Sequence, residues 1–252
     1  MAPKSLALFL ICILGISVAF AKPLTPGQKR AYSRLRKDFF LAVALPPSRT
    51  KKTRKEHRDF IRQTRKFRKK VGEDHPGHAA AADYYKGRMY LKIRRLDKAR
   101  KAFDSSLALL RSGKVTEDNR PGSMPSACTI AVFRAFTFSN DGNETVLAEL
   151  EAIPEKDGKP TYHDVGATIN RWADSLEQND LDEEARRAYV LALKWDLWED
   201  ESDNPKRKLD RIKMKTQDLS LDTPQVEPET QEAQAEEGAQ EKAEAEQSAD
   251  EP

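Results

Sequence analysis

The chain has 252 residues, of which 34% are charged and only 8% are aromatic. This composition favours a helical protein with thin hydrophobic cores over a large enzyme fold, and the length allows one or two domains. The formal net charge is +3, but the charge divides along the chain. Residues 22–120 hold 29 Lys and Arg against 10 Asp and Glu, whereas residues 121–252 hold 14 against 31. Such an asymmetry indicates charged partners or attraction within the chain.

The N-terminal segment, residues 1–21, has the pattern of a secretory signal peptide. Lys4 precedes an apolar run of 15 residues, and Ala19-Phe20-Ala21 offers small residues before a cleavage site. The run is shorter than the roughly 20 residues that a membrane-spanning helix needs. We expect cleavage after Ala21, a secreted or periplasmic protein, and no transmembrane helix after cleavage. The alternative is an uncleaved anchor. Cleavage would leave Cys128 as a single cysteine in an apolar stretch, which predicts a buried thiol.

Residues 22–72 predict a pair of helices. Thr25 and Gln28 have the spacing of a capping box at the start of the first helix, and Pro46 should end it. Residues 49–70 predict a second, basic helix, which Gly72 closes. Its apolar side chains recur at helical spacing along one narrow stripe. The members of this stripe are Phe60, Thr64, Phe67 and Val71.

The basic helix over residues 49–70 carries 12 cations against Glu56 and Asp59. A solvated helix face explains part of this run, but like charges at i,i+4 repel each other, so a compensating anion is expected. Three sources of that anion stay open: lipid headgroups or an anionic surface polymer, an acidic protein partner, and the acidic end of this chain. Genomic nucleic acid is not expected if the protein is exported. The candidate polyanion-binding residues are Arg54, Lys55, Arg58, Arg62, Arg65, Lys66 and Lys69.

Residues 73–215 predict three helical hairpins, over 73–113, 126–154 and 164–198. In the first hairpin, Asp97 is expected to cap the second helix. Residues 216–252 differ in character, because they hold 12 Asp and Glu against one Lys and no aromatic residue. Such a segment cannot bury enough apolar surface to offset the entropy of ordering, so we expect a disordered acidic tail.

The first and last hairpins share a pattern of small and large side chains with a constant offset of 86 residues. Antiparallel helices approach closely only where a small residue faces a large one. The order in each hairpin is small, large, small, aromatic, small. The matching residues are Gly87, Tyr90, Ala99, Phe103 and Ser106 in the first hairpin, and Ala173, Leu176, Ala185, Tyr189 and Ala192 in the last.

This spacing resembles the tetratricopeptide repeat (TPR), and "GEDHP" at residues 72–76 resembles the start of the kinesin-light-chain type of repeat. The middle hairpin departs from the pattern, because Val146 and Leu150 stand where Ala and an aromatic residue are usual. Asp83 also replaces an aromatic residue. The resemblance implies an all-α fold in which the hairpins stack into a short TPR-like solenoid.

A stack of this kind binds partners through a groove lined mainly by the first helix of each hairpin. By the family's pattern, the partner-binding residues would be Tyr84, Arg88, Lys92, Asn170 and Asp174. Arg88 and Lys92 favour an acidic partner or a C-terminal peptide.

The motifs of common catalytic and cofactor sites are missing from the sequence. It has no nucleophile elbow, phosphate-binding loop, dinucleotide fingerprint or zinc-ligand spacing. His75 and His78 have no third histidine or cysteine nearby, and we interpret them as part of a helix start. We predict no enzyme, cofactor or metal site. The predicted function is an exported scaffold that binds a protein through a TPR-like groove. The alternative is a structural protein that associates with a polyanion or an envelope surface through residues 49–70.

Overall fold

The computed structural model describes residues 23–44, 51–160, 162–198 and 204–221. These segments contain helices and connecting loops and no β-strand, which confirms the predicted all-α fold. The predicted signal peptide and most of the predicted acidic tail lie outside the described residues. The chain divides into two compact units, residues 1–209 and 210–252. Helix α10 (Pro205–Leu221) includes the first six residues of the predicted tail, 216–221.

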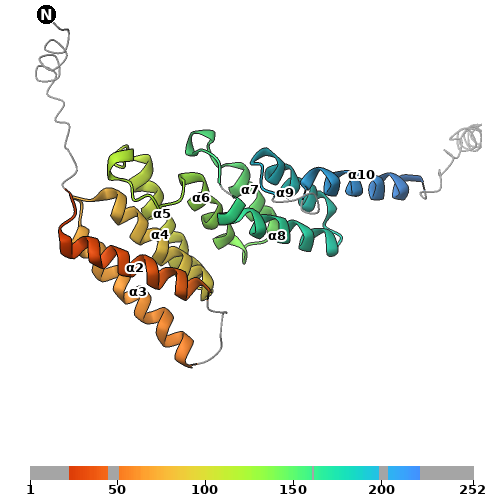
Figure 1. Cartoon of the computed structure of the whole chain (residues 1–252). Helices are drawn as coiled ribbons and strands as arrows, with labels where there is room; N and C mark the ends of the chain where they lie inside the picture. Colours follow the sequence, from red (N-terminus) through yellow and green to blue (C-terminus); the bar gives the residue numbers. More distant parts are fainter. Residues whose placement is uncertain (1–22, 45–50, 161, 199–203, 222–252) are drawn as a thin grey trace, which may run out of the picture. The chain divides into compact units, whose positions relative to one another are not determined.

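Helices α2 (Pro26–Ala44) and α3 (Lys51–Val71) form the predicted N-terminal pair and pack against each other (Figure 1). The capping box is present: the Thr25 amide donates to Gln28 Oε1 at 2.8 Å, and the Gln28 amide donates to Thr25 Oγ1 at 3.3 Å. Gly72 ends α3 with a φ of +56°, a conformation that glycine adopts without strain. Phe60, Thr64, Phe67 and Val71 are all buried, which confirms the predicted apolar stripe.

Helices α4 (Pro76–Lys92) and α5 (Leu96–Arg111) form the first hairpin. Gly87 is the point of closest approach, since a Cβ atom built on it would lie 2.6 Å from a ring carbon of Phe103. Ser106 Oγ adds a buried hydrogen bond of 2.8 Å to the Ala80 carbonyl of α4. Arg95, not Asp97, occupies the N-cap of α5, and no side chain caps this helix. Asp97 lies in the first turn, where its charge still favours the helix N-terminus.

Helices α8 (Ala167–Gln178) and α9 (Asp182–Lys194) form the last hairpin. All ten residues of the small-and-large pattern are buried in the two hairpins. The offset of 86 residues also applies to the backbone of the turns. Arg94 and Asp180 have φ values of 56° and 57°. In each turn the following amide donates a hydrogen bond to the equivalent carbonyl. The Arg95 amide donates to the Tyr90 carbonyl at 2.9 Å, and the Leu181 amide donates to the Leu176 carbonyl at 3.0 Å. The two turns therefore share one geometry without glycine.

Helices α6 (Ala127–Ala135) and α7 (Asn143–Glu151) lie between these hairpins in the chain and match the predicted middle pair. Three 3-10 turns, Glu117–Asn119, Phe136–Phe138 and Glu155–Asp157, and a π-helical turn, Tyr162–Gly166, complete the helical segments. Cys128 is buried, as predicted, and burial raises the pKa of its thiol to about 12, with Asp157 adding to the effect. Consecutive helices from α2 to α6 pack against one another. A continuous TPR-like solenoid stays a prediction.

We expect Gly87→Ala to destabilise the protein. Overpacking against Phe103 costs about 1–3 kcal/mol, and the better helix propensity of alanine offsets about 1 kcal/mol of that cost. Gly27→Ala is the matched control, because an added Cβ there meets no atom within 4 Å. Urea unfolding should show Gly87→Ala to be less stable than Gly27→Ala. Adding Phe103→Leu to Gly87→Ala should restore part of the lost stability, because the smaller side chain makes room for the new Cβ. Equal stability of the two alanine variants would contradict the close packing.

Candidate polyanion-binding face

The exposed side of α3 carries all but one of the Lys and Arg residues of this helix whose side chains are described. The seven candidates Arg54, Lys55, Arg58, Arg62, Arg65, Lys66 and Lys69 are all exposed, and so is Lys70. The buried stripe of Phe60, Thr64 and Phe67 lies on the opposite side of the helix. The helical spacing of the residues alone therefore places the cations on the solvent side of α3 and the apolar residues on the buried side.

Helix α2 adds a second basic surface, which was not predicted from the sequence because only the cations of residues 49–70 were considered as a site. Five cations of α2 are exposed: Lys29, Arg30, Arg34, Arg36 and Lys37. The spacing of Arg30, Arg34 and Lys37 at i, i+4 and i+7 could have revealed this arrangement. We call the exposed cations of α2 and α3 together the basic face.

Acidic residues are few on α2 and α3, and they are partly covered. Among the residues of α2 and α3 whose side chains are described, the acids are Asp38, Glu56 and Asp59, and all three are half-buried. Arg62 pairs with Asp59 at 3.0 Å, and both side chains are open to solvent. An exposed pair of this kind contributes little, about 0–1 kcal/mol.

Most other cations of the basic face have no ion pair within the described part of the chain. Arg65 differs, because its guanidinium donates a hydrogen bond of 2.6 Å to the hydroxyl of Tyr90. Arg68 turns away from the basic face, since it is half-buried and its Nε donates to the buried carboxylate of Asp83 at 3.1 Å. Arg54, Lys55, Arg58, Lys66 and Lys69 thus keep their charge available for an external anion.

Aromatic packing on the inner side holds α2 in place. The Phe39 ring stacks on the Tyr85 ring of α4, with centroids 4.3 Å apart, and lies 6.0 Å from the Phe60 ring of α3. Lys92 of α4 donates hydrogen bonds to two carbonyls at the C-terminus of α2, Ala42 at 3.2 Å and Val43. A cation at this end also complements the helix dipole.

The predicted partner-binding residues of the first hairpin are engaged within the chain. Tyr84 is buried, with 4% exposure, and its hydroxyl accepts a hydrogen bond of 2.7 Å from Arg88. The Arg88 guanidinium lies 3.7 Å from the centre of the Phe133 ring of α6. Lys92 donates hydrogen bonds to carbonyls at the end of α2. These side chains stabilise the contacts of α4 with α2 and α6, and a ligand would have to displace those contacts.

The two predicted residues of the last hairpin are also engaged. Asn170 is buried, with 2% exposure, and donates a hydrogen bond of 2.7 Å to the Leu197 carbonyl. Asp174 accepts hydrogen bonds from the Tyr189 hydroxyl at 2.6 Å and from Lys208 Nζ at 2.7 Å. The role of all five residues in partner binding stays a prediction, and their positions do not favour it.

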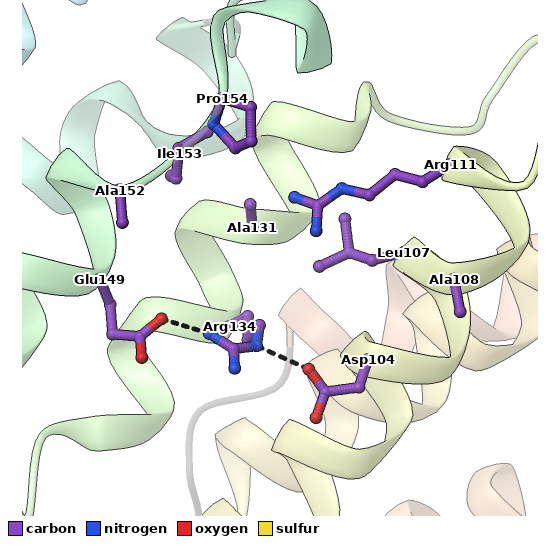
Figure 2. Close-up of a pocket in the computed structure, with 10 residues that line it drawn as sticks. All are labelled: Asp104, Leu107, Ala108, Arg111, Ala131, Arg134, Glu149, Ala152, Ile153 and Pro154. Carbon is purple, nitrogen blue, oxygen red and sulfur yellow. Dashed lines mark hydrogen bonds and ion pairs between the residues drawn. The ribbon is translucent and has the colours of Figure 1, made fainter.

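A pocket of about 350 Å³ lies between α5, α6 and α7 (Figure 2). The guanidinium of Arg134 bridges two carboxylates in it, Asp104 at 2.6 Å and Glu149. Burial lowers the pKa of Arg134, but the hydrogen bonds and charges of these carboxylates raise it overall. Arg111 is likewise held by Asp157, so the pocket offers little free positive charge.

The described residues hold no group of three or more His, Cys, Asp or Glu side chains that could bind a metal ion. Within these same segments, no helix has the length and apolar character needed to cross a membrane. Comparisons with protein-family models, with curated proteins and with solved structures give no match to this chain. The TPR resemblance therefore stays a prediction, and the basic face is the surface whose chemistry the geometry defines best.

The junction that holds α2 should make stability depend on pH through His57. This side chain is 3% exposed, and its Nε2 has no hydrogen-bond partner among the described residues. Burial lowers the pKa of His57, and the Lys92 ammonium lowers it further. A hydrogen bond to the Ala42 carbonyl and the charge of Glu56 raise the pKa, but the net shift is downward. The unfolded chain binds this proton near the ordinary pKa of about 6.5, whereas the folded chain resists it. We expect stability to fall as the pH drops through about 6.5.

His57→Gln keeps a hydrogen-bond donor but removes this titration. Urea-unfolding midpoints measured between about pH 7.5 and pH 5 should fall less steeply for the variant than for the natural chain. His78, whose pKa burial and His75 also lower, titrates in both proteins, so the difference isolates His57. Parallel pH profiles would show that His57 is not held neutral.

Proposed function

We propose that the protein is a non-enzymatic binding protein that holds a polyanion on its basic face. The observation that supports this function is the excess of exposed cations on α2 and α3, where the three acidic residues with described side chains are half-buried. Solubility alone does not require this excess, because soluble surfaces usually intersperse charges of both signs. An exported location, secreted or periplasmic, belongs to the same proposal.

Repulsion within the basic face gives the physical reason for a ligand. Arg54, Arg58, Arg62 and Lys66 follow one another at intervals of four residues along the exposed side of α3. Each such pair of like charges costs a few tenths of a kcal/mol, about 0.2–0.5. An anionic chain or surface laid along the helix would remove these penalties and release bound counterions. Binding should therefore weaken steeply as salt is added.

The aromatic residues of α3 argue against recognition of single-stranded nucleic acid. Such recognition commonly combines a basic groove with exposed aromatic rings on which bases stack. Phe60 and Phe67 are only 3% and 4% exposed, so their rings are not available for stacking, and Phe40 is the one exposed aromatic ring among the described residues of α2 and α3. Repeating phosphate, sulfate or carboxylate groups, which need charge and hydrogen-bond donors alone, fit this side of the molecule better.

A scaffold that binds a protein partner is the second candidate function. It is supported by the two hairpins with equivalent turns and by the pocket between α5, α6 and α7, whose walls mix apolar and charged side chains (Figure 2). The residues first expected to line a TPR-like groove have partners within the chain. Salt distinguishes the two candidates, because binding in the pocket should tolerate salt that abolishes binding to the basic face.

Charge reversal tests the proposed function. The α3 variant carries Arg58→Glu and Lys66→Glu, which place two acids among the exposed cations of that helix. The control α5 variant carries Lys98→Glu and Lys101→Glu at two exposed lysines, so the net charge changes by the same amount. The probes are heparin and long-chain inorganic polyphosphate, measured by fluorescence anisotropy or calorimetry at several salt concentrations. We expect the α3 variant to bind at least about tenfold more weakly at about 0.1 M salt, with a shallower salt dependence.

The α5 variant should bind within about threefold of the natural chain, because its changes lie outside the basic face. Equal losses in both variants would show that net charge, and not this face, determines binding. Unchanged binding by the α3 variant, with its helical circular dichroism intact, would overturn the proposed function.

A further inference from the structure

The exposed side of α2 combines charge with apolar side chains. Two adjacent rows run along it at spacings of i, i+4, i+7 and i+11, and each row starts with polar residues and ends with a large apolar residue. The rows are Lys29, Ser33, Arg36 and Phe40, and Arg30, Arg34, Lys37 and Leu41. Residues at these spacings lie on one side of a helix. The two apolar residues therefore lie next to each other at the C-terminal end of a basic surface.

Phe40 and Leu41 are open to solvent to an unusual degree for their size, with exposures of 56% and 59%. The other large hydrophobic residues exposed in the described part of the chain, Val190 and Met214, lie on different helices. Arg36 stays close to the aromatic ring, with its guanidinium carbon 5.9 Å from the centre of Phe40. Met214 also neighbours exposed cations of α10, whereas at the end of α2 two large exposed apolar residues lie together beside such cations.

The packing of α2 holds the two side chains outward. Their neighbours in sequence, Phe39 and Ala42, are 5% and 6% exposed, so the helix cannot rotate to bury Phe40 without exposing Phe39. The stack of Phe39 on Tyr85 and the hydrogen bonds from Lys92 fix the end of the helix. Exposure of the two residues is therefore built into a firmly held element and does not result from fraying.

We propose, on the basis of the proposed function, that the polyanion is the surface of an anionic lipid bilayer. The cations of α2 and α3 would face lipid phosphates, while Phe40 and Leu41 would enter the boundary between headgroups and acyl chains. Peripheral helices bind membranes through this combination of anionic attraction and shallow apolar burial. A soluble polyanion would satisfy the cations but would leave the two apolar side chains in water.

The charges argue against a second copy of this chain as the occupant. Pairing two copies through α2 would bring two sets of exposed cations together with only the half-buried Asp38 on each helix, and such like-charge contacts are costly. A protein partner would need an acidic surface around an apolar recess. A bilayer that contains anionic lipid supplies both properties without a matching shape.

The experiment uses a double variant that carries both Phe40→Ser and Leu41→Ser. Its control is Val190→Ser, which removes an exposed apolar side chain from α9. Binding is measured by co-sedimentation with vesicles of phosphatidylcholine alone and of phosphatidylcholine mixed with phosphatidylglycerol. Heparin binding is measured alongside. The full chain and the form that begins at Lys22 are both used, so that the apolar segment of residues 6–20 can be recognised if it is the source of binding.

We expect binding to the mixed vesicles in both forms and little binding to phosphatidylcholine alone. The double variant should lose at least about tenfold in affinity for the mixed vesicles, while its heparin binding and that of Val190→Ser stay unchanged. Natural-chain binding to heparin without binding to the mixed vesicles would overturn this inference and leave the proposed function intact. Failure to bind either probe would overturn both.

Two further outcomes would also contradict the inference. Vesicle binding that is equal in the natural chain and the double variant would show that Phe40 and Leu41 do not enter the bilayer. A change in oligomeric state between these two proteins, measured by light scattering, would show that the residues contact a second copy instead.

Discussion

The stack of aromatic rings between α2, α3 and α4 is the interaction on which the basic face depends. Exposed cations along two neighbouring helices repel one another, and the three half-buried acids of those helices offset only part of the repulsion. Burial of Phe39 against Tyr85 and Phe60 acts in the opposite direction, because each large apolar side chain removed from water contributes about 1.5–3 kcal/mol. The inner side of the pair therefore supplies the stability that the outer side lacks, and it fixes the direction in which Phe40 and Leu41 point.

The first hairpin connects this pair to the rest of the first unit through a buried carboxylate. Asp83 is 2% exposed and accepts hydrogen bonds from Arg68 of α3 at 3.1 Å and from Ser105 of α5 at 2.8 Å. A buried charge is tolerated only when it is paired in this way, so three helices are tied at one point. The close contact of Gly87 with Phe103 brings α4 and α5 together beside it. The charged surface is thus carried by a helical framework with its own defined packing.

Local spacing predicted much of the fold but less of the candidate site. The stripe from Phe60 to Val71, the capping box at Thr25 and the ten small and large positions of the two hairpins follow from periodicity and side-chain size, so the sequence predicted them correctly. The groove residues depend on contacts between segments far apart in the chain. Arg88 lies over Phe133 and Lys92 reaches the end of α2, and neither partner is visible in the local pattern. The basic surface of α2 was not predicted, because only the cations of residues 49–70 were considered as a site.

Native-state hydrogen exchange tests most directly the claim that the basic face is uncompensated. Protection of the amides of α2 and α3 is measured as sodium chloride rises from about 0.02 M to about 0.3 M, with α8 and α9 as the internal reference. If the cations repel one another without acidic partners, screening should increase protection in α2 and α3 relative to α8 and α9. A decrease in protection in α2 and α3 relative to that reference would show that acidic groups already neutralise the face and would contradict the account.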